Sequence, residues 1–490
     1  MTIKRSNTLI FIPTYNEREN VENMCRELLA LGLGADLMFL DDNSPDGTGA
    51  ILDALAEKHP EVSVVHRPGK LGIGTAHQDG INRAYEMGYE RLITMDCDFT
   101  HAPADVLRLV EASNGFDVTV GSRYMGENSL PGWNLFRRSL TKLGHYLTGR
   151  LLQLKYDATG ALRVYNLKTI PRGLFGMVVS RGYSFFFESL FLMVRNNLRV
   201  REVPIVLPAR TYGHSKMSIR EMFKSLQQLV TLSASTWSNP SQFRYVERAI
   251  VVDPKLVDPQ GWDAYWKSKQ RTSTFVYEVA AAVYRNLTLK GRLNHFVRKH
   301  FQSGSKLLHA GCGGGQVDQE IQRDMTITPL DISVPALQLY QRNNPDTPEP
   351  KHGDILALPY DANTFDGVYN LGVMEHFTTE QIERILSEFK RVLKPGGKVL
   401  IFWPYCHATS VLFLNTVHYV LNDVFHKAVT LHPAEISLLR GRKQAERYVA
   451  RAGFEMVDYY FGARDGLIQA VIVARKPQKK TERRDAERQR

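Results

Sequence analysis

The stretch RLITMDCDFTHAP, residues 91–103, places two aspartates, Asp96 and Asp98, directly after a short apolar run. A run of this length predicts a buried strand, and strands often end at acidic turn residues. The two carboxylates are therefore either an ordinary strand end or ligands of a cation and a phosphate. The neighbouring sequence distinguishes these interpretations.

Further apolar runs precede this stretch, at residues 8–14, 36–42 and 62–66, and amphipathic helical segments separate them. This alternation predicts a parallel sheet with covering helices. Polar loops follow three of the strands: PTYNE after the first, DDNSPDGT after the second and DCDFTH after the fourth. Because ligands of open α/β sheets bind beyond the carboxyl ends of the strands, we expect these loops to form one site.

A second alternating region begins near Trp262. KLLHAGCGGG, residues 306–315, predicts a strand that enters a glycine loop, and the segment from Thr379 predicts an amphipathic helix that stops at KPGG. Between the two regions the sequence contains prolines and no sustained periodicity. We expect two different α/β domains, at 1–235 and 262–475, with a linker at 236–261 and a basic disordered tail at 476–490.

The composition fits a folded protein of two or three domains, with 490 residues, 43% apolar and 23% charged. Four scattered cysteines predict neither a disulfide framework nor a zinc site, which favours a reducing cytoplasm. The net charge of +11 is partly in the tail. Nucleic acid is not expected as a partner, because the basic residues lack an interleaved aromatic patch.

The first half resembles the dolichyl-phosphate (polyprenyl-phosphate) mannosyltransferases, which are inverting GT-A glycosyltransferases of family 2. The resemblance covers roughly residues 5–235, and the segments that carry it are FIPTYNERENV, LDDNSPDGT, RPGKLGIGTAH, MDCDFTHAP, GSRY, DATGALRVY and VPIVLPARTYGHSKMS. It implies a GT-A, Rossmann-like domain that transfers a sugar, mannose from GDP-mannose, to a dolichyl or polyprenyl phosphate.

Carried over position by position, the resemblance implies three groups of site residues. The guanosine of the donor would contact Pro13, Tyr15, Glu17, Leu40 and Asp42. The diphosphate and a Mg²⁺ or Mn²⁺ ion would meet Asp96, Cys97, Asp98 and Thr100, of which Asp96, Asp98 and Thr100 are the predicted metal ligands. The phosphates of donor and acceptor would contact Arg123, Arg210 and Lys216, with Arg137 as a further candidate. The predicted catalytic residues are Asp98, Arg123 and Lys216.

This reaction needs no general base. A phosphate monoester has a second pKa of roughly 6, so the acceptor oxygen is already ionised, and the enzyme mainly holds two anions in line. No apolar run reaches the roughly 18–20 residues that span a bilayer. We expect peripheral attachment to the cytoplasmic face of a membrane, through the basic amphipathic segment 135–156 and the phenylalanine cluster around Phe186. The alternative for both is packing on the domain's own core.

The second half resembles the class I S-adenosylmethionine-dependent methyltransferases over roughly residues 262–475, through LLHAGCGGGQ, LDIS, HGDILALP and VLKPGGKVLI. The resemblance implies a second Rossmann-like domain whose S-adenosylmethionine site contains Gly311, Gly313, Gly315, Asp331, Asp354 and Ile355. His309 stands where the family usually has an acid, which weakens the expected contact to the cofactor's ammonium. For His352 and His376, an ordinary role in a loop or in the core is a plausible alternative to a functional one.

The leading hypothesis is a bifunctional enzyme: a metal-dependent sugar transferase that uses a nucleotide sugar and a polyprenyl phosphate, fused to an S-adenosylmethionine-dependent methyltransferase. One alternative changes the donor to another nucleotide sugar such as UDP-glucose, or the acceptor to a glycan. A second makes the methyltransferase-like half a non-catalytic binding or scaffold module. The apolar insert at 410–433 either caps an acceptor site or is a core helix.

Overall fold

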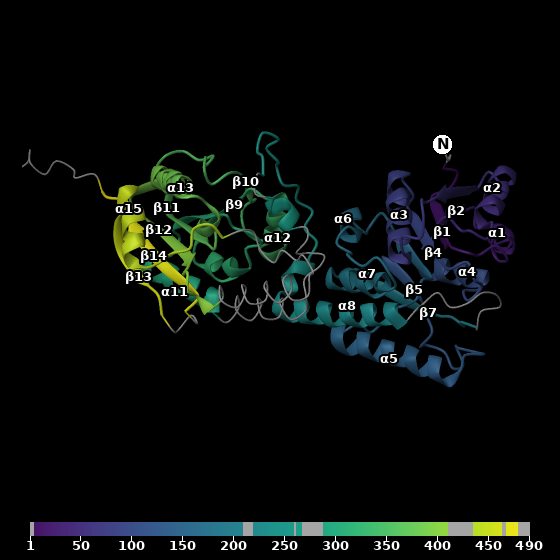
Figure 1. Ribbon diagram of the computed structural model, residues 1–490. Coiled ribbons are helices and arrows are strands. Elements are labelled where there is room, and N and C mark those ends of the chain that lie inside the picture. Colours follow the sequence, from purple (N-terminus) through teal and green to yellow (C-terminus); the bar gives the residue numbers. More distant parts are fainter. Residues whose placement is uncertain are drawn as a thin grey trace, which may run out of the picture. The chain divides into compact units, whose positions relative to one another are not determined.

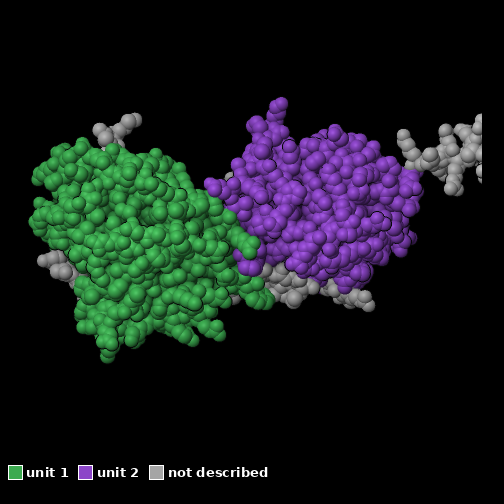
Figure 2. Space-filling view, turned by 180° about the vertical axis from the view of Figure 1, so that it is seen from behind, with its two compact units in different colours: residues 1–237, 243–245 green, residues 238–242, 246–490 purple. Residues whose placement is uncertain are grey.

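The computed structural model describes residues 4–208, 219–258, 261–266, 288–409, 435–462 and 467–478. The chain divides into two compact units, which Figure 2 shows in different colours. The first contains Met1–Trp237 and Phe243–Tyr245, and the second contains Ser238–Gln242 and Val246–Arg490. Each unit has its own seven-stranded sheet.

The sheet of the first unit has the strand order β3-β2-β1-β4-β6-β5-β7. Its strands are β1 (Thr8–Thr14), β2 (Asp36–Asp41), β3 (Val62–His66), β4 (Arg91–Thr94), β5 (Val118–Ser122), β6 (Arg163–Asn166) and β7 (Val200–Pro204). The first four strands are parallel, as the alternating sequence predicts. β6 runs antiparallel to both of its neighbours, β4 and β5, which the sequence did not indicate.

Helices cover both faces of this sheet, because successive strand residues point to opposite sides (Figure 1). In β1, Leu9 and Phe11 face a core shared with α3, α6 and α7, whereas Ile10 and Ile12 face a core shared with α1, α2 and α4. The helices are α1 (Val21–Ala30), α2 (Thr48–Lys58), α3 (Ile73–Glu86), α4 (Pro103–Ala112), α5 (Leu135–Leu152), α6 (Arg172–Phe175), α7 (Ser184–Arg195) and α8 (Ile219–Ser238).

The phenylalanine cluster lies on α7 and is part of the core. Phe185, Phe186 and Phe187 are at most 4% exposed. The ring of His77, on α3, lies 5.4 Å from the ring of Phe185 and 5.0 Å from that of Phe186, measured between centroids. The expected contact of these phenylalanines with a membrane is therefore wrong, because a helix that is apolar on all sides packs inside the domain.

Arg163 at the start of β6 is fully buried and joins α7 to the loop before β6. Its guanidinium donates to the carbonyl oxygens of Ala158 (2.9 Å), Gly160 (3.0 Å) and Phe186 (2.8 Å). It also donates to the Ser189 hydroxyl at 3.1 Å. A buried charge without such partners is very costly, so these bonds fix the loop against the helix.

The sheet of the second unit has the order β10-β9-β8-β11-β12-β14-β13. Its strands are β8 (Lys306–Ala310), β9 (Thr326–Asp331), β10 (Lys351–His352), β11 (Phe365–Leu371), β12 (Leu393–Pro404), β13 (Glu455–Tyr460) and β14 (Gln469–Arg475). β10, β9, β8, β11 and β12 are parallel neighbours, and β14 is antiparallel to β12 and β13. The fold is thus α/β with two mixed sheets.

The second sheet is also covered on both faces. α13 and α15 share one core with Val368 and Ile401, while α11 shares the other with Tyr369 and Phe402. The described helices are α11 (Lys290–His300), α12 (Val334–Asn343), α13 (Thr379–Val392) and α15 (Arg442–Arg451), with short 3₁₀ turns η3 (Gln316–Gln319), η4 (Ile321–Arg323) and η5 (Met374–His376). α13 starts at Thr379 as predicted, with a capping box built on Thr378.

The KPGG segment was predicted as the end of the helix that starts at Thr379. It is also part of a strand, because β12 begins at Leu393 and includes these residues. The register of β12 against β11 shifts there, between Phe365 and Gly367, and Gly396 has a φ of +79°.

Among the described residues, none of the helices combines the length and apolar content that crossing a bilayer requires.

Candidate functional sites

In the first unit, the loops after β1 and β2 are tied to each other. The backbone N–H of Asp42 donates to the Thr14 carbonyl at 3.0 Å, and that of Glu17 donates to the Thr48 hydroxyl at 2.9 Å. The residues predicted to contact the guanosine, Pro13, Tyr15, Glu17, Leu40 and Asp42, therefore lie at the ends of two paired strands. Sequence-distant loops meet here because parallel strands end at the same edge of the sheet.

Arg67, directly after β3, holds the buried carboxylate of Asp42. Its Nε lies 2.5 Å from Asp42 Oδ1, and its Nη1 donates to Asp79 Oδ2 at 3.1 Å. Burial raises the pKa of Asp42, while the hydrogen bond and charge of Arg67 act in the opposite direction. Arg67 is not among the residues predicted for the site, although its place at a strand end and in the RPGK segment is a usable signal.

The two aspartates after β4 have different surroundings. Asp98 is buried and accepts hydrogen bonds at Oδ1 from the backbone N–H (3.1 Å) and hydroxyl (2.6 Å) of Thr100. Phe99 between them has a φ of +56°, a left-handed conformation that non-glycine residues rarely adopt. Asp96 is more open, with 35% of its side chain exposed, and its Oδ2 lies 3.9 Å from His101 Nδ1. Among the described residues, no group of three or more His, Cys, Asp or Glu forms a metal cluster.

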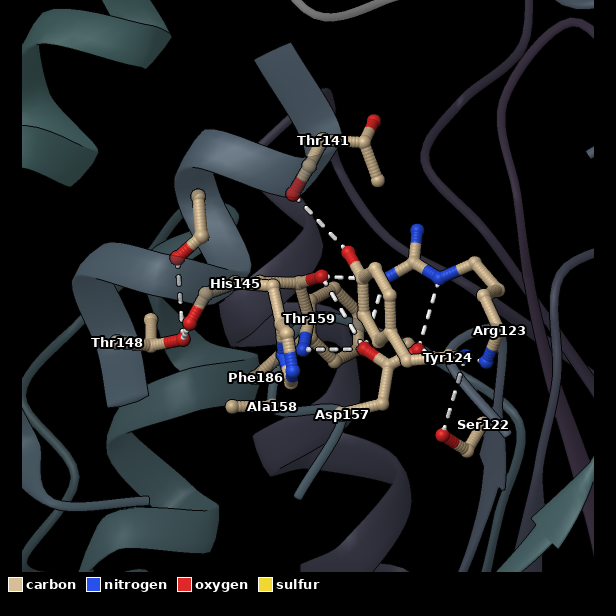
Figure 3. Close-up of polar contacts among 12 residues, drawn as sticks. Ser122, Arg123, Tyr124, Thr141, His145, Thr148, Asp157, Ala158, Thr159 and Phe186 are labelled. Atoms are coloured by element: carbon tan, nitrogen blue, oxygen red, sulfur yellow. Dashed lines mark hydrogen bonds and ion pairs between the residues drawn. The ribbon is translucent and has the colours of Figure 1, made fainter. Parts of the chain in front are cut away.

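Arg123, directly after β5, is oriented by Asp157 and Thr159 (Figure 3). Its Nε and Nη2 donate to the two carboxylate oxygens of Asp157 at 2.8 and 2.7 Å, and Nη2 also donates to the Thr159 hydroxyl. Burial alone would lower the pKa of Arg123, but the charge and hydrogen bonds of Asp157, with further contributions from Tyr124 and Asp96, raise it. Burial would raise the pKa of Asp157, yet Arg123 lowers it to about 2.

Tyr124 connects this site to α5 (Figure 3). Its ring stacks on His145 with a centroid distance of 3.8 Å and an interplanar angle of 15°, and its hydroxyl donates to the Thr141 carbonyl at 3.0 Å. Both partners lie on α5, so the position of this helix is coupled to the loop that holds Arg123. The sequence offered no signal for this coupling.

Of the four cations predicted to contact phosphates, two are described. Arg123 lies in the site as above, and the guanidinium carbon of Arg137 lies 3.9 Å from the centre of the Trp133 ring near the start of α5. Arg210 and Lys216 lie outside the described residues, as does the apolar insert at 410–433.

In the second unit, the glycine loop after β8 closes against Asp331. Gly311, Gly313 and Gly315 have φ angles of +73°, +52° and +61°, which favour glycine. The N–H of Gly313 donates to Asp331 Oδ2 at 2.8 Å, and that of Ser333 donates to Oδ1 at 2.9 Å. Burial raises the pKa of Asp331, and these backbone bonds oppose the shift. Loop and acid thus form one cradle at the end of β8 and β9.

His309, where an acid was expected, contacts a buried acid instead. Its Nδ1 lies 2.7 Å from Asp318 Oδ2, which also accepts from the Tyr340 hydroxyl at 2.8 Å. The other carboxylate oxygen, Oδ1, accepts from the Tyr369 hydroxyl at 2.9 Å. Asp318 is fully buried, so a carboxylate is present beneath the glycine loop although the usual position lacks one. The sequence could not indicate this partner, which lies nine residues further on in a segment without strand periodicity.

The remaining predicted cofactor residues follow β10. Asp354 accepts from the backbone N–H of Leu356 at 2.9 Å, and Ile355 is buried. His352 has a structural role, since Nδ1 accepts from the Asp253 N–H at 3.0 Å and Nε2 lies 3.0 Å from the Ile332 carbonyl.

The comparisons with known proteins agree with this division. A glycosyl transferase family 2 model matches residues 9–170, and a methyltransferase domain model matches residues 308–401. A polyprenol monophosphomannose synthase of Mycolicibacterium smegmatis is 38% identical over 44% of this chain and 84% of its own length. An undecaprenyl-phosphate mannosyltransferase of Micrococcus luteus is 35% identical over 43% of this chain and 87% of its own length.

Solved structures similar to the chain include the magnesium protoporphyrin IX methyltransferase of Synechocystis, at 15% identity and a TM-score of 0.33, covering 44% of this chain and 94% of that one. The two sequence relatives decide the assignment of the first unit, because each is matched over most of its length. The chain belongs to the family 2 glycosyltransferases, related to the polyprenyl-phosphate mannose synthases, and carries a C-terminal class I methyltransferase domain.

Proposed function

We propose that the first unit transfers a mannosyl group from GDP-mannose to a dolichyl or polyprenyl phosphate, and that the second transfers a methyl group from S-adenosylmethionine. The observation that carries the first proposal is the gathering of Asp42, Asp98 and the Glu17 loop at the ends of neighbouring strands. The names of the two relatives, a polyprenol monophosphomannose synthase and an undecaprenyl-phosphate mannosyltransferase, support the sugar and the lipid.

The donor nucleoside would lie on Pro13, Tyr15, Glu17, Leu40 and Asp42. Arg67 keeps the Asp42 carboxylate in a fixed orientation, so that it can accept hydrogen bonds from a base or ribose. This ion pair is formed before the donor arrives, and binding then requires little reorganisation.

A divalent cation fits the residues after β4. Mg²⁺ is commonly held by one or two carboxylates together with substrate phosphates and waters. Asp96, Asp98 and Thr100 would therefore be its protein ligands, and Cys97 would lie beside the diphosphate. The cation would neutralise charge on the leaving nucleoside diphosphate. Thr100 orients Asp98 through two hydrogen bonds.

The acceptor phosphate is already ionised, so the protein's task is to hold it near the anomeric carbon. Arg123 is a described cation that suits this role, because Asp157 and Thr159 fix the direction of its guanidinium, and Arg137 is a further described candidate. Arg210 and Lys216 would add positive charge. Inversion at the anomeric carbon follows from direct attack by the phosphate oxygen, without a covalent intermediate.

Two helices of the first unit present a surface for the lipid. α5 carries four Arg or Lys residues and exposes Leu135 and Phe136, and α8 exposes Phe223 and Trp237. Both helices contribute to the same core, through Leu152, Leu229 and Leu232. Exposed apolar side chains beside basic ones are typical of helices that lie in a membrane interface.

Vesicle co-sedimentation tests this surface. The double variant Phe136→Asp, Phe223→Asp should bind anionic phospholipid vesicles roughly tenfold more weakly than the unmodified chain. Val457→Asp, a change of an exposed side chain on β13, is the matched control. Equal binding of all three proteins would contradict the surface.

In the second unit, S-adenosylmethionine would contact Gly311, Gly313, Gly315, Asp331, Asp354 and Ile355. The fit rests on the positive φ angles of the loop and on its closure by Asp331. The cofactor supplies an electrophilic methyl group, and the protein supplies alignment with the acceptor.

The reaction is tested with purified protein, labelled GDP-mannose, a polyprenyl phosphate and Mg²⁺ or Mn²⁺. Transfer of label to the lipid supports the proposal. Transfer only from another donor such as UDP-glucose would change the proposed donor, and transfer only to a glycan would change the proposed acceptor. Calorimetry with S-adenosylmethionine tests the second unit separately: absence of binding would favour a scaffold role.

A further inference from the structure

Glu375, in the turn η5 after β11, is a buried acid that the functions above do not use. It is 4% exposed, and its Oε2 has no hydrogen-bond partner among the described residues. Leaving a buried carboxyl oxygen unpaired is costly, and native proteins rarely do so without a functional reason.

Glu375 lies beside the proposed cofactor cradle. A methyl group at Gly311 would lie 2.9 Å from Cγ2 of Val373, so the turn that contains Glu375 touches the glycine loop. The segment 261–266 contacts both parts: a methyl group at Gly313 would lie 2.8 Å from Trp266 Cζ2, and the Trp262 ring centroid lies 5.0 Å from that of His376.

A second side chain with an unpaired oxygen lies near Glu375. Gln469, at the start of β14, also has a buried amide oxygen, Oε1, without a partner in the described part of the chain. Both side chains lie near Gly372, each through its other polar atom: a methyl group there would lie 3.3 Å from Glu375 Oε1 and 3.8 Å from Gln469 Nε2. Two side chains near one glycine, each with an unpaired acceptor oxygen, suit a ligand that brings hydrogen-bond donors.

We propose that Glu375 and Gln469 bind a hydroxyl group of a neutral polyol as the methyl acceptor, and that the Glu375 carboxylate takes the hydroxyl proton. This inference rests on the proposed methyltransferase function. The bond that forms joins the hydroxyl oxygen to the methyl carbon, and the bond that breaks joins that carbon to sulfur. The sulfonium electrons return to sulfur, S-adenosylhomocysteine leaves, and the proton remains on Glu375.

The surroundings favour a hydroxyl over an amine. Burial raises the pKa of Glu375 to about 8, with a further contribution from the charge of Glu435, so the carboxyl can exchange a proton near neutral pH. Among the described residues, His376 also lies close, with its Nε2 3.8 Å from Glu375 Oε1. A carboxyl that is easily protonated is a weak counterion for an ammonium group, whereas it and the Gln469 amide suit a neutral hydroxyl.

The test uses the full chain with labelled S-adenosylmethionine and two probes, octyl mannopyranoside and octylamine. The unmodified chain should methylate the mannoside and not the amine. Glu375→Gln keeps an acceptor oxygen but not the base, so it should lower the transfer rate by about 10²-fold with little change in KM. Glu380→Gln, an exposed acid on α13, is the control.

Two binding measurements separate the possible failures. Calorimetry should give the same S-adenosylmethionine Kd, within about twofold, for the unmodified chain and Glu375→Gln. Gln469→Leu, tested with S-adenosylhomocysteine present, should weaken binding of octyl mannopyranoside roughly tenfold. If the unmodified chain does not bind S-adenosylmethionine, the proposed function itself fails. Three results with a chain that binds the cofactor would overturn only the acceptor assignment: faster methylation of octylamine than of the mannoside, no methylation of the mannoside, or an unchanged transfer rate in Glu375→Gln.

Discussion

Two buried carboxyl groups, one in each unit, show opposite behaviour. Asp157 lies beside Arg123, which lowers its pKa to about 2, whereas burial raises the pKa of Glu375, which has an unpaired oxygen, to about 8. Each lies in a loop or turn next to a strand of its own sheet, and both are buried. The difference shows that the partner, rather than the depth of burial, sets the charge of a buried acid.

The contrast matches the ligands proposed for the two units. The first would hold anions, for which Asp157 fixes the orientation of Arg123, while Arg67 fixes the carboxylate of Asp42. The second would hold a sulfonium cofactor with glycine backbone and Asp331, and leaves Glu375 able to change its protonation state.

The largest expected effect tests whether the two sites are independent. Asp98→Asn removes one negative charge from the proposed cation site and should lower sugar transfer by roughly 10³-fold or more. Calorimetric binding of S-adenosylmethionine should not change. Asp53→Asn, an exposed acid on α2, serves as the control, and loss of both activities in Asp98→Asn would break the comparison.

The next effect concerns stability. Asp157→Asn leaves the buried charge of Arg123 without its counterion and should destabilise the first unit by about 3–5 kcal/mol in urea unfolding. Asp105→Asn breaks a pair in which Arg108 is half exposed and should cost under about 1 kcal/mol. Equal losses in the two variants would mean that burial of the pair is unimportant.

The pH dependence of the two units should have opposite signs. The folded pKa of Asp157 lies below its unfolded value of roughly 3.9, so its contribution is present above about pH 4 and is lost as the pH falls toward 2. For Glu375 the folded pKa of about 8 exceeds the ordinary value of 4.5, so stability is highest below pH 4.5 and falls as the pH rises to 8. Calorimetric unfolding of the full chain across this range would show both trends.

The smallest effect sharpens the second half of that prediction. Glu375→Gln should have nearly the same unfolding temperature as the unmodified chain at pH 5. At pH 9 its unfolding temperature should exceed that of the unmodified chain, because the variant no longer buries a charged carboxylate. The expected difference is about 2–4 °C for each kcal/mol of this free-energy cost. A parallel pH profile for the two proteins would show that Glu375 is not the group that titrates.

The sequence was sufficient for the α/β class of both units and for the first four strands of the first unit with the helices between them, because apolar periodicity and polar strand ends are local signals. It also placed Asp42, Asp98 and Gly313 at one edge of their sheets. It could not identify Asp157 as the partner of Arg123, since the two are 34 residues apart and meet only through the antiparallel insertion of β6.

The phenylalanines of α7 illustrate a second limit. Phe186 is as apolar in a membrane interface as in a core, and only the tertiary contacts with His77 and Arg163 separate these environments. Likewise, the acid that contacts His309 is Asp318, which belongs to none of the recognised sequence motifs. Local patterns predict elements, whereas pairings between elements depend on the assembled fold.

Arg163 has a consequence for the order of assembly. The guanidinium makes all these hydrogen bonds only when the loop at 158–160 and the carbonyl group of Phe186 are both in place. If only one of them is in place, a buried cation keeps unpaired N–H groups, which is very unfavourable. Partial docking of α7 is therefore disfavoured, and this helix and the loop that carries Thr159 should open and close as one cooperative unit. Amide protons of the two segments, though distant in sequence, should exchange with solvent together.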